Sequence, residues 1–485
     1  MIRKSTRQRR IYQILILAAI LMVSVDTAIS QQPNPESSNL GEDILKPFAS
    51  LRKEQMLTLA KTIGIEPTAE TQEIFRSIEM NDFKSASNQY AIIRQNIGQY
   101  KGSTSNPKYH NELWQYVLET FGTHEQFHIW TPGLLRKYAY DILDPIPANS
   151  IYFGGTDPGR FVITAFNAVN DERKIHVITQ NALADWNYLE FARRQHADHD
   201  IWLPSKEDSA KAFQQYVEGV RSGKIDDKGT LEIKSGRVNI RGALGVMQIN
   251  GIIVKMIFEN NKDSHEFYLE ESYIIDWMYP YLEPHGLIMK LNKTTLDKLS
   301  EEVVSKDRKF WKQYVGQLQK HPEFADNLAA QKSFSKLRTA IAGLYEFHEL
   351  YDEAEAAFRQ AIRLWPEASE ASFRLAKMYE KKGQIDEARK VINTYIEQDP
   401  HDSLDKAKDY LADLDNKRPL NPEEKKEITE LILRLGGQDA SVRGDAKKRL
   451  EGFGSRSLAM LKQHVENKDP EIRITVRELI KQMEK

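Results

Sequence analysis

The amino-acid sequence predicts a multidomain protein, in which an α/β domain with a mostly parallel sheet follows a helical leader and precedes an α-solenoid. Three observations support this prediction. Short apolar runs alternate with helical patterns over residues 143–295, which favours strand–helix–strand units. From residue 296 onward the apolar spacing is helical throughout. Within that last part, residues of similar type recur 34 positions apart.

The composition is that of an ordinary globular protein. A chain of 485 residues is long enough for about two to four domains. The formal net charge of −2 provides no basic field for nucleic acid, so we expect no nucleic-acid partner. The chain has no cysteine, which excludes disulfides, thiolate metal ligands and a cysteine nucleophile.

Residues 1–30 have the features of a signal peptide. Arginines and a lysine precede the apolar run Ile11–Val25, and the small residues Ala28 and Ser30 precede Gln31. The apolar run is shorter than the about 20 residues that span a bilayer. We therefore expect a mature chain that begins near Gln31 and is periplasmic or secreted. The alternative is an uncleaved membrane anchor, the only case in which we expect membrane contact.

Helical and polar patterns fill the chain up to the α/β domain. Residues 31–41 are polar and contain two prolines, which is typical of a disordered leader. Apolar residues at three- and four-residue spacing predict helices over residues 42–142.

In the α/β domain the apolar runs predict buried strands joined by helices. The alternating pattern of Leu231–Ile240 around Ser235 and Gly236 predicts an antiparallel hairpin instead. The expected strands of the parallel sheet are residues 151–153, 161–164, 175–179, 201–203 and 287–291.

The first strand is followed by the candidate ligand site. Its turn consists of Gly154, Gly155, Thr156, Asp157, Pro158, Gly159 and Arg160. Glycines allow backbone amides to approach an anion, and Arg160 can bind a phosphate or carboxylate. Open α/β sheets bind ligands at the carboxyl ends of their strands. The alternative is a structural turn in which Arg160 forms a salt bridge.

The second strand ends beside this turn and adds polar side chains. Gln180, Asn181 and Asp185 offer amides and a carboxylate that suit a glycan or another small polar ligand. Asp157 and Asp185 could act as the acid and base of a carbohydrate or cell-envelope enzyme. The alternative for Asp185 is to cap the next helix.

Two later segments are expected to complete the cleft. Glu270 is followed by another glutamate, and His285 precedes the last strand. The alternative for His285 is a solvated turn. The chain has neither a Walker loop nor a G-x-G-x-x-G motif, so we predict no cofactor.

One stretch matches the zinc-protease pattern H-E-x-x-H. His124 and His128 would share a helix face, with Glu125 as the general base. However, Gly122 lies just before the pattern, Pro132 follows closely, and no convincing third ligand lies downstream. A metal site at His124 and His128 is therefore the weaker alternative, and we expect none.

The helical part contains two copies of a repeat. The paired positions are Tyr345 and Tyr379, Ala354 and Ala388, and Pro366 and Pro400. This spacing resembles the tetratricopeptide repeat, over residues 336–415, with residues 296–335 as connecting helices. The tryptophan usual in the first helix is replaced by Arg338 and Ser372. The resemblance implies binding of a protein partner through a helical groove.

A shorter repeat follows at residues 420–485. Asp439 and Arg443 recur as Asp469 and Arg473, 30 positions later. This pattern resembles HEAT-like repeats, in which such residues order the turns between helices. Asn421 is expected to cap the first helix of this part. The alternative is a generic helical tail.

The block from residue 43 to 310 resembles an uncharacterised family of exported bacterial proteins. The runs that support this are Ile151–Phe161, Thr179–Asp185 and Trp277–Lys290. More distantly, the block is similar to the soluble tail of O-mannosyltransferase-like membrane proteins. The multi-spanning catalytic part of those proteins has no counterpart here, so the resemblance implies a ligand-binding role and not the transferase activity. We therefore expect an exported scaffold that binds a protein partner through residues 336–485 and a polar or glycan ligand through its α/β domain. The alternative is the enzyme described above.

Overall fold

A computed structural model describes residues 40–98, 104–170, 173–226, 231–234, 237–240, 243–270 and 275–484. The chain divides into two compact units, Met1–Trp365 and Pro366–Lys485, which are described separately. The expected signal peptide lies outside the described residues. The leader was expected to reach residue 41, but a helical turn, η2 (Gly41–Leu45), already begins there, because Leu40, Ile44 and Leu45 are buried.

In the described part of the first unit, five α-helices follow η2. Gly64, with φ of 71°, ends the first, and the side chains of Thr68 and Asp82 cap the second and third. These helices are α3 (Lys46–Ile63), α4 (Ala69–Glu79), α5 (Phe83–Asn96), α6 (Asn111–Ile129) and α7 (Pro132–Leu143).

The sheet of the first unit is mixed, which corrects the prediction of a mostly parallel sheet. Its order is β2-β1-β5-β7-β6. β1 pairs in parallel with β2 and β5, whereas β7 pairs antiparallel with β5 and β6. Only Gly286, with φ of 65°, and Leu287 separate β6 from β7. A connection this short can join only antiparallel strands. The strands are β1 (Ile151–Gly154), β2 (His176–Thr179), β5 (Phe267–Leu269), β6 (Leu282–His285) and β7 (Ile288–Leu291).

Two expected strands are not strands. Residues 161–164 belong to η3 (Pro158–Val162) and α8 (Ile163–Val169). The run is buried, and a short buried apolar run has the same pattern in a helix as in a strand. Residues 201–203 form no ladder, and the amide side chain of Asn261 hydrogen-bonds the backbone of Trp202 instead.

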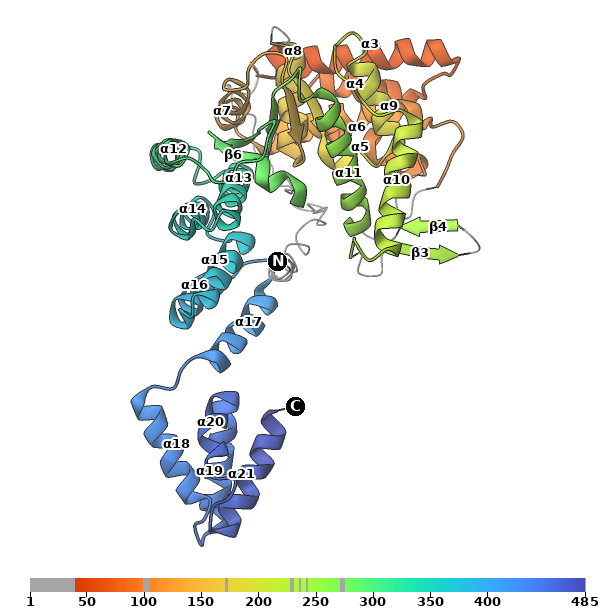
Figure 1. Ribbon diagram of the computed structural model, residues 1–485. Helices are drawn as coiled ribbons and strands as arrows, with labels where there is room; N and C mark the ends of the chain where they lie inside the picture. Colours follow the sequence, from red (N-terminus) through yellow and green to blue (C-terminus); the bar gives the residue numbers. More distant parts are fainter. Residues whose placement is uncertain are drawn as a thin grey trace. The chain divides into compact units, whose positions relative to one another are not determined.

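The expected hairpin is confirmed. β3 (Leu231–Lys234) and β4 (Arg237–Ile240) pair antiparallel, with Leu231 opposite Ile240. The hairpin connects two helices and lies apart from the five-stranded sheet (Figure 1).

Further helices complete the first unit. Two short 3-10 turns, η5 (Gln180–Ala182) and η6 (Asp276–Tyr281), lie beside the sheet strands in sequence. The helices are α9 (Trp186–Gln195), α10 (Lys206–Arg221), α11 (Ala243–Asn261), α12 (Glu301–Lys320), α13 (Leu328–Phe347) and α14 (Tyr351–Leu364).

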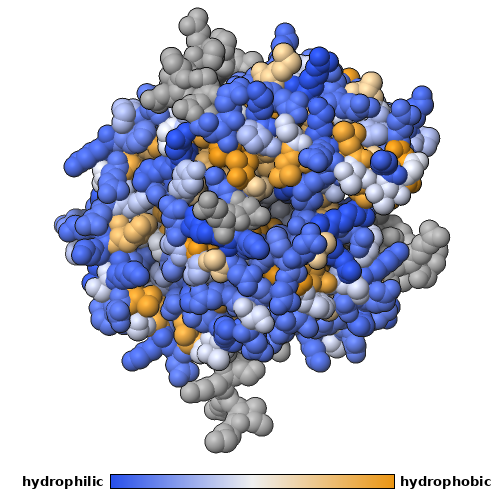
Figure 2. All heavy atoms as spheres, turned by 90° about the horizontal axis from the view of Figure 1, so that it is seen from above, coloured by the Kyte–Doolittle hydropathy of each residue, from blue (hydrophilic) through white to orange (hydrophobic). Residues whose placement is uncertain are grey.

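Within the described residues, no helix combines the length and the apolar character needed to cross a bilayer. On the face shown in Figure 2, hydrophilic residues dominate, and hydrophobic residues form small separate groups. Most of the large apolar side chains in the described ranges are instead in the core, among them Phe153, Tyr216 and Trp311.

The second unit is helical throughout its described part. A cluster of buried aliphatic residues and Phe453 forms the core of its last four helices. The elements are α15 (Ser369–Lys381), α16 (Ile385–Glu397), α17 (Leu404–Lys417), α18 (Pro422–Arg434), α19 (Ala440–Phe453), η7 (Gly454–Ser457), α20 (Leu458–Lys462) and α21 (Pro470–Met483).

Candidate functional site

The two polar segments that the sequence placed at strand ends do meet. In the parallel ladder Gly154 of β1 is opposite Thr179 of β2, so both strands end at the same edge. Asn181 Nδ2 donates to the carbonyl oxygen of Gly155 at 2.6 Å. The Asn181 residue is exposed, as is Asp157. The two segments that follow β1 and β2 are therefore neighbours at the carboxyl edge of the sheet.

The glycine turn does bind a carboxylate, but the carboxylate belongs to the same chain. Glu270 follows β5 and is completely buried. It accepts hydrogen bonds from the backbone amides of Gly155 at 2.8 Å and Thr156 at 3.0 Å, and from Tyr138 Oη at 3.1 Å. The Thr156 hydroxyl donates to it as well. The amides that could have bound an external anion are therefore occupied.

This arrangement explains two of the glycines. A Cβ on Gly159 would lie 1.9 Å from the Glu270 carboxylate. A Cβ on Gly154 would lie 2.4 Å from the carbonyl oxygen of Gly159. Both positions thus require glycine, because the backbone folds closely around the Glu270 side chain.

Arg160 and Asp157 form an ion pair across one turn of η3. Arg160 Nη2 lies 2.8 Å from Asp157 Oδ1, and the Asp157 side chain is 54% exposed. The Arg160 guanidinium also lies 4.1 Å from the ring centroid of Phe161. Nearby, burial raises the pKa of Glu125, and the Asp157 charge raises it further. Arg160 is thus already paired, as in the structural alternative for this turn.

The remaining predicted residues have partners of their own. Asp185 caps α9 by accepting from the amide of Asn187 at 2.9 Å, and burial raises its pKa. Gln180 is fully buried. His285 Nε2 lies 3.1 Å from the carbonyl oxygen of Pro145. Strands β5 and β7 separate its strand, β6, from β1, a distance of about 14 Å at the usual strand spacing. His285 therefore belongs to a different part of the sheet edge.

The H-E-x-x-H pattern is helical, within α6, but its histidines have other contacts. His124 Nε2 lies 3.1 Å from Asn81 Oδ1, and burial followed by the His128 charge lowers its pKa to about 4. The His128 ring stacks on Phe83 with centroids 3.9 Å apart. Among the described residues, no third metal-ligating side chain groups with this pair.

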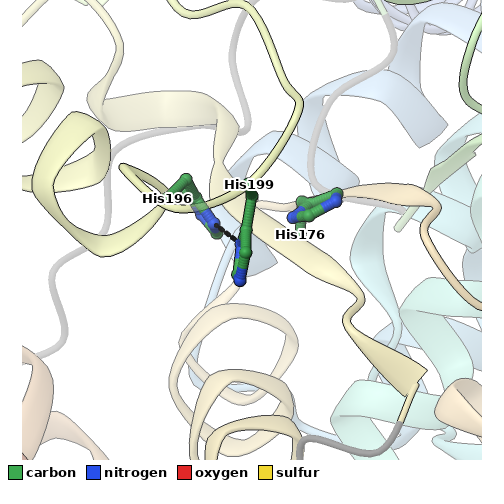
Figure 3. Close-up of side chains that lie close together, drawn as sticks. All are labelled: His176, His196 and His199. Atoms are coloured by element: carbon green, nitrogen blue, oxygen red, sulfur yellow. Dashed lines mark hydrogen bonds between the residues drawn. The ribbon is translucent and has the colours of Figure 1, made fainter.

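The described residues do contain one cluster of three histidines, which the sequence did not reveal. His176, His196 and His199 each offer a ring nitrogen, and these atoms lie within 4.8 Å of one another (Figure 3). Burial and the neighbouring imidazoles lower the pKa of His176 to about 3. Burial, followed by His199, lowers the pKa of His196 to about 4. The short interval from His196 to His199 was the only signal in the sequence, because His176 comes from another element.

In the repeat region, Arg338 replaces the usual tryptophan and forms a buried ion pair. Its Nη1 lies 2.8 Å from Asp307 Oδ2 of α12, with side-chain exposures of 3% and 2%. Tyr345 Oη donates to the same oxygen at 2.7 Å. Arg338 also lies 4.9 Å from the ring centroid of Trp311. A buried polar network thus ties α12 to the repeat helix α13.

In residues 420–485 the recurring aspartates and arginines contact the turns between helices. The side chains of Asp439 and Asp469 cap α19 and α21. Arg443 Nη1 donates to the carbonyl oxygen of Gly437 at 2.8 Å, and Arg473 Nη1 donates to that of Asn467 at 2.7 Å. Both arginines therefore bind the carbonyl two residues before the capping aspartate.

Comparison with known protein families identifies one region. Residues 340–403 match the tetratricopeptide repeat family. No curated protein matches the chain.

Proposed function

Because residues 340–403 are tetratricopeptide repeats, we propose that this protein is a scaffold that binds another protein through its helical repeats. Repeats of this kind stack helices side by side and leave an extended surface for a partner. The proposal rests on that match together with a mixed polar and aromatic surface on the second unit.

This surface, the α15–α17 face, consists of Phe373, Lys377, Glu380, Tyr410 and Lys417. Phe373, Lys377 and Glu380 are spaced to share one side of α15, and all three are half-buried. The Phe373 ring stacks on Tyr410 with centroids 5.8 Å apart. Glu380 accepts from Tyr410 Oη at 2.6 Å and pairs with Lys417 at 2.8 Å. Aromatic side chains held in place by such contacts provide rigid area for binding a peptide segment.

The test uses the full mature chain as bait and a matched pair of charge reversals. Lys377→Glu changes the α15–α17 face, whereas Lys390→Glu changes an exposed lysine on α16. A partner captured by wild type is then purified and its affinity measured for each variant. We expect binding at least about tenfold weaker for Lys377→Glu and unchanged for Lys390→Glu. Equal affinity for both variants and wild type refutes a role for this face.

We also propose that the protein acts outside the cytoplasm. The support is the cationic start and short apolar run of residues 1–30, before Gln31. Mass spectrometry of the protein isolated from cells tests this directly. A first residue near Gln31 supports export with cleavage, and an intact Met1 on soluble cytosolic protein contradicts it.

A small polar ligand, such as a glycan, is a further proposal for the carboxyl edge of the sheet. It is supported by the exposure of Asp157 and Asn181 beside Gly155. Since Glu270 occupies the amides of the turn, a ligand would bind these side chains instead of the backbone. A glycan and metabolite thermal-shift screen on wild type and Asp157→Ala tests the idea. A shift in wild type that is absent from Asp157→Ala supports it, and no shift with any compound contradicts it.

A further inference from the structure

Three histidines from two separate segments converge near the amino end of β2. His176 is the first residue of β2, His196 follows the last residue of α9, and His199 lies in the next turn. One ring nitrogen from each lies within 4.8 Å of the others (Figure 3). We propose that these three side chains bind one divalent transition-metal ion, with Zn²⁺ as the expected ion.

The hydrogen bonds of His176 leave one nitrogen available for a metal. Its Nε2 lies 3.0 Å from Asn149 Oδ1. An amide oxygen only accepts, so Nε2 carries the proton and Nδ1 carries the lone pair. Nδ1 is buried and has no hydrogen-bond partner within the described part of the chain. Metal-binding histidines typically donate their other ring N–H to an oxygen in this way, and a metal at Nδ1 explains the unsatisfied atom.

The other two rings already have nearly the required spacing. His196 Nδ1 and His199 Nδ1 lie 3.4 Å apart. Two nitrogens that each lie about 2.0–2.1 Å from a tetrahedral zinc ion are separated by about the same distance. The His176 ring centroid lies 5.4 Å from that of His196 and 4.9 Å from that of His199. Side-chain movements of about 1 Å therefore suffice to complete the three bonds.

A second set of contacts holds the three rings in place. His265 Nδ1 lies 2.8 Å from the carbonyl oxygen of Asn149, and its Nε2 lies 2.6 Å from that of Asp200. Both ring nitrogens of His265 thus have a hydrogen-bond partner. His265 is a positioning residue that links Asn149 to the turn that contains His199. Asn149 itself has φ of 59°, in the left-handed region that asparagine adopts more readily than most other non-glycine residues.

The ligand type selects the ion. Three imidazoles suit zinc, copper and nickel, whereas magnesium and calcium prefer oxygen ligands. His196 and His199 are only half-buried, which leaves a fourth position for water. Three histidines and a water molecule form a known zinc arrangement. Binding would join β2 to the turn after α9, because the ligands come from both.

The experiment uses the full chain, purified without a histidine tag and stripped of metal by a chelator. Zn²⁺ is titrated in competition with a chromophoric chelator, and Co²⁺ serves as a spectroscopic probe of tetrahedral binding. Wild type is expected to bind one equivalent. His199→Gln, at a half-buried position outside the helices and strands, is expected to bind at least about 100-fold more weakly and to lose the visible Co²⁺ bands. Asn149→Gly keeps the positive φ but removes Oδ1, and should weaken binding about 10–100-fold.

His128→Gln is the matched control, since it removes a histidine of the H-E-x-x-H pattern and leaves the three-histidine cluster intact. It is expected to bind Zn²⁺ as tightly as wild type, and circular dichroism establishes that each variant is folded. If the affinity for Zn²⁺ depends on His128 but not on His199, the metal binds at the H-E-x-x-H pattern and the proposal is overturned. Affinities that agree within about threefold across all variants, or no binding by wild type, overturn it as well.

Discussion

The Glu270 side chain makes a strong prediction about the stability of the first unit. Four donors point at this completely buried carboxylate: two backbone amides, the Thr156 hydroxyl and Tyr138 Oη. Replacing it with glutamine keeps one accepting oxygen but turns an NH₂ group toward donors. Each hydrogen bond to a charged group contributes about 1.5–3 kcal/mol. Losing two of them predicts that Glu270→Gln destabilises the unit by about 3–6 kcal/mol.

Urea unfolding followed by tryptophan fluorescence measures this change in the right part of the chain. All 7 tryptophans lie at or before Trp365, within the first unit. Glu266→Gln is the control: its carboxylate pairs with Lys290 and is 42% exposed, so its loss is expected to cost below about 1 kcal/mol. A free energy of unfolding for Glu270→Gln within about 1 kcal/mol of wild type refutes the proposed role of the carboxylate.

A double-mutant cycle isolates the contact between Glu270 and the turn. Gly159→Ala places a Cβ 1.9 Å from the carboxylate, so it is expected to destabilise the wild-type unit. In a Glu270→Ala background the overlap disappears, and Gly159→Ala should then have a smaller effect. Strictly additive effects show that the added methyl group acts through another contact.

Three further predictions concern other parts of the chain. Arg338→Met leaves Asp307 buried without its cation and should destabilise the first unit by about 3–5 kcal/mol in the same urea assay. Arg359→Met, which breaks an exposed pair with Glu355, is the control. Equal effects of the two variants contradict the prediction. The pKa of His124 is lowered to about 4, mainly by burial, so the folded state disfavours its protonation. The folded state is therefore most stable above the unfolded-state pKa of about 6.5, and its free energy of unfolding falls by up to about 3 kcal/mol as the pH drops toward 4. His124→Gln should reduce this loss in thermal unfolding between pH 7 and 4. An unchanged pH profile contradicts the role of His124. Asn421 and Glu424 form a capping box on α18, so Asn421→Ala should cost about 1 kcal/mol and raise amide exchange in its first turn about fivefold, whereas exchange equal to wild type argues against the cap.

Local patterns in the sequence determined the helical repeats. The spacing of Tyr345 and Tyr379 defines the phase of the tetratricopeptide repeats, because every repeat must bury equivalent positions against its neighbours. Asn421 was predicted as a helix cap, and Asp439 and Asp469 as residues that order turns; all three cap helices. Each side chain binds an amide only two or three residues away, so the relevant contacts are contained in a short stretch of sequence.

Only the tertiary structure decided the chemistry around the sheet. The sequence predicted that the turn at Gly154–Arg160 can bind an anion, but Glu270 reaches Gly155 from 115 residues away, through the pairing of β1 with β5. The tertiary structure likewise brings His176 of β2 to His196 and His199, which follow α9. Residues 161–164 are helical instead of extended. The sequence pattern could not show this, because burial on all sides removes the periodicity that distinguishes a helix from a strand. Contacts between distant segments depend on strand order and register, which local patterns in a single sequence do not reveal.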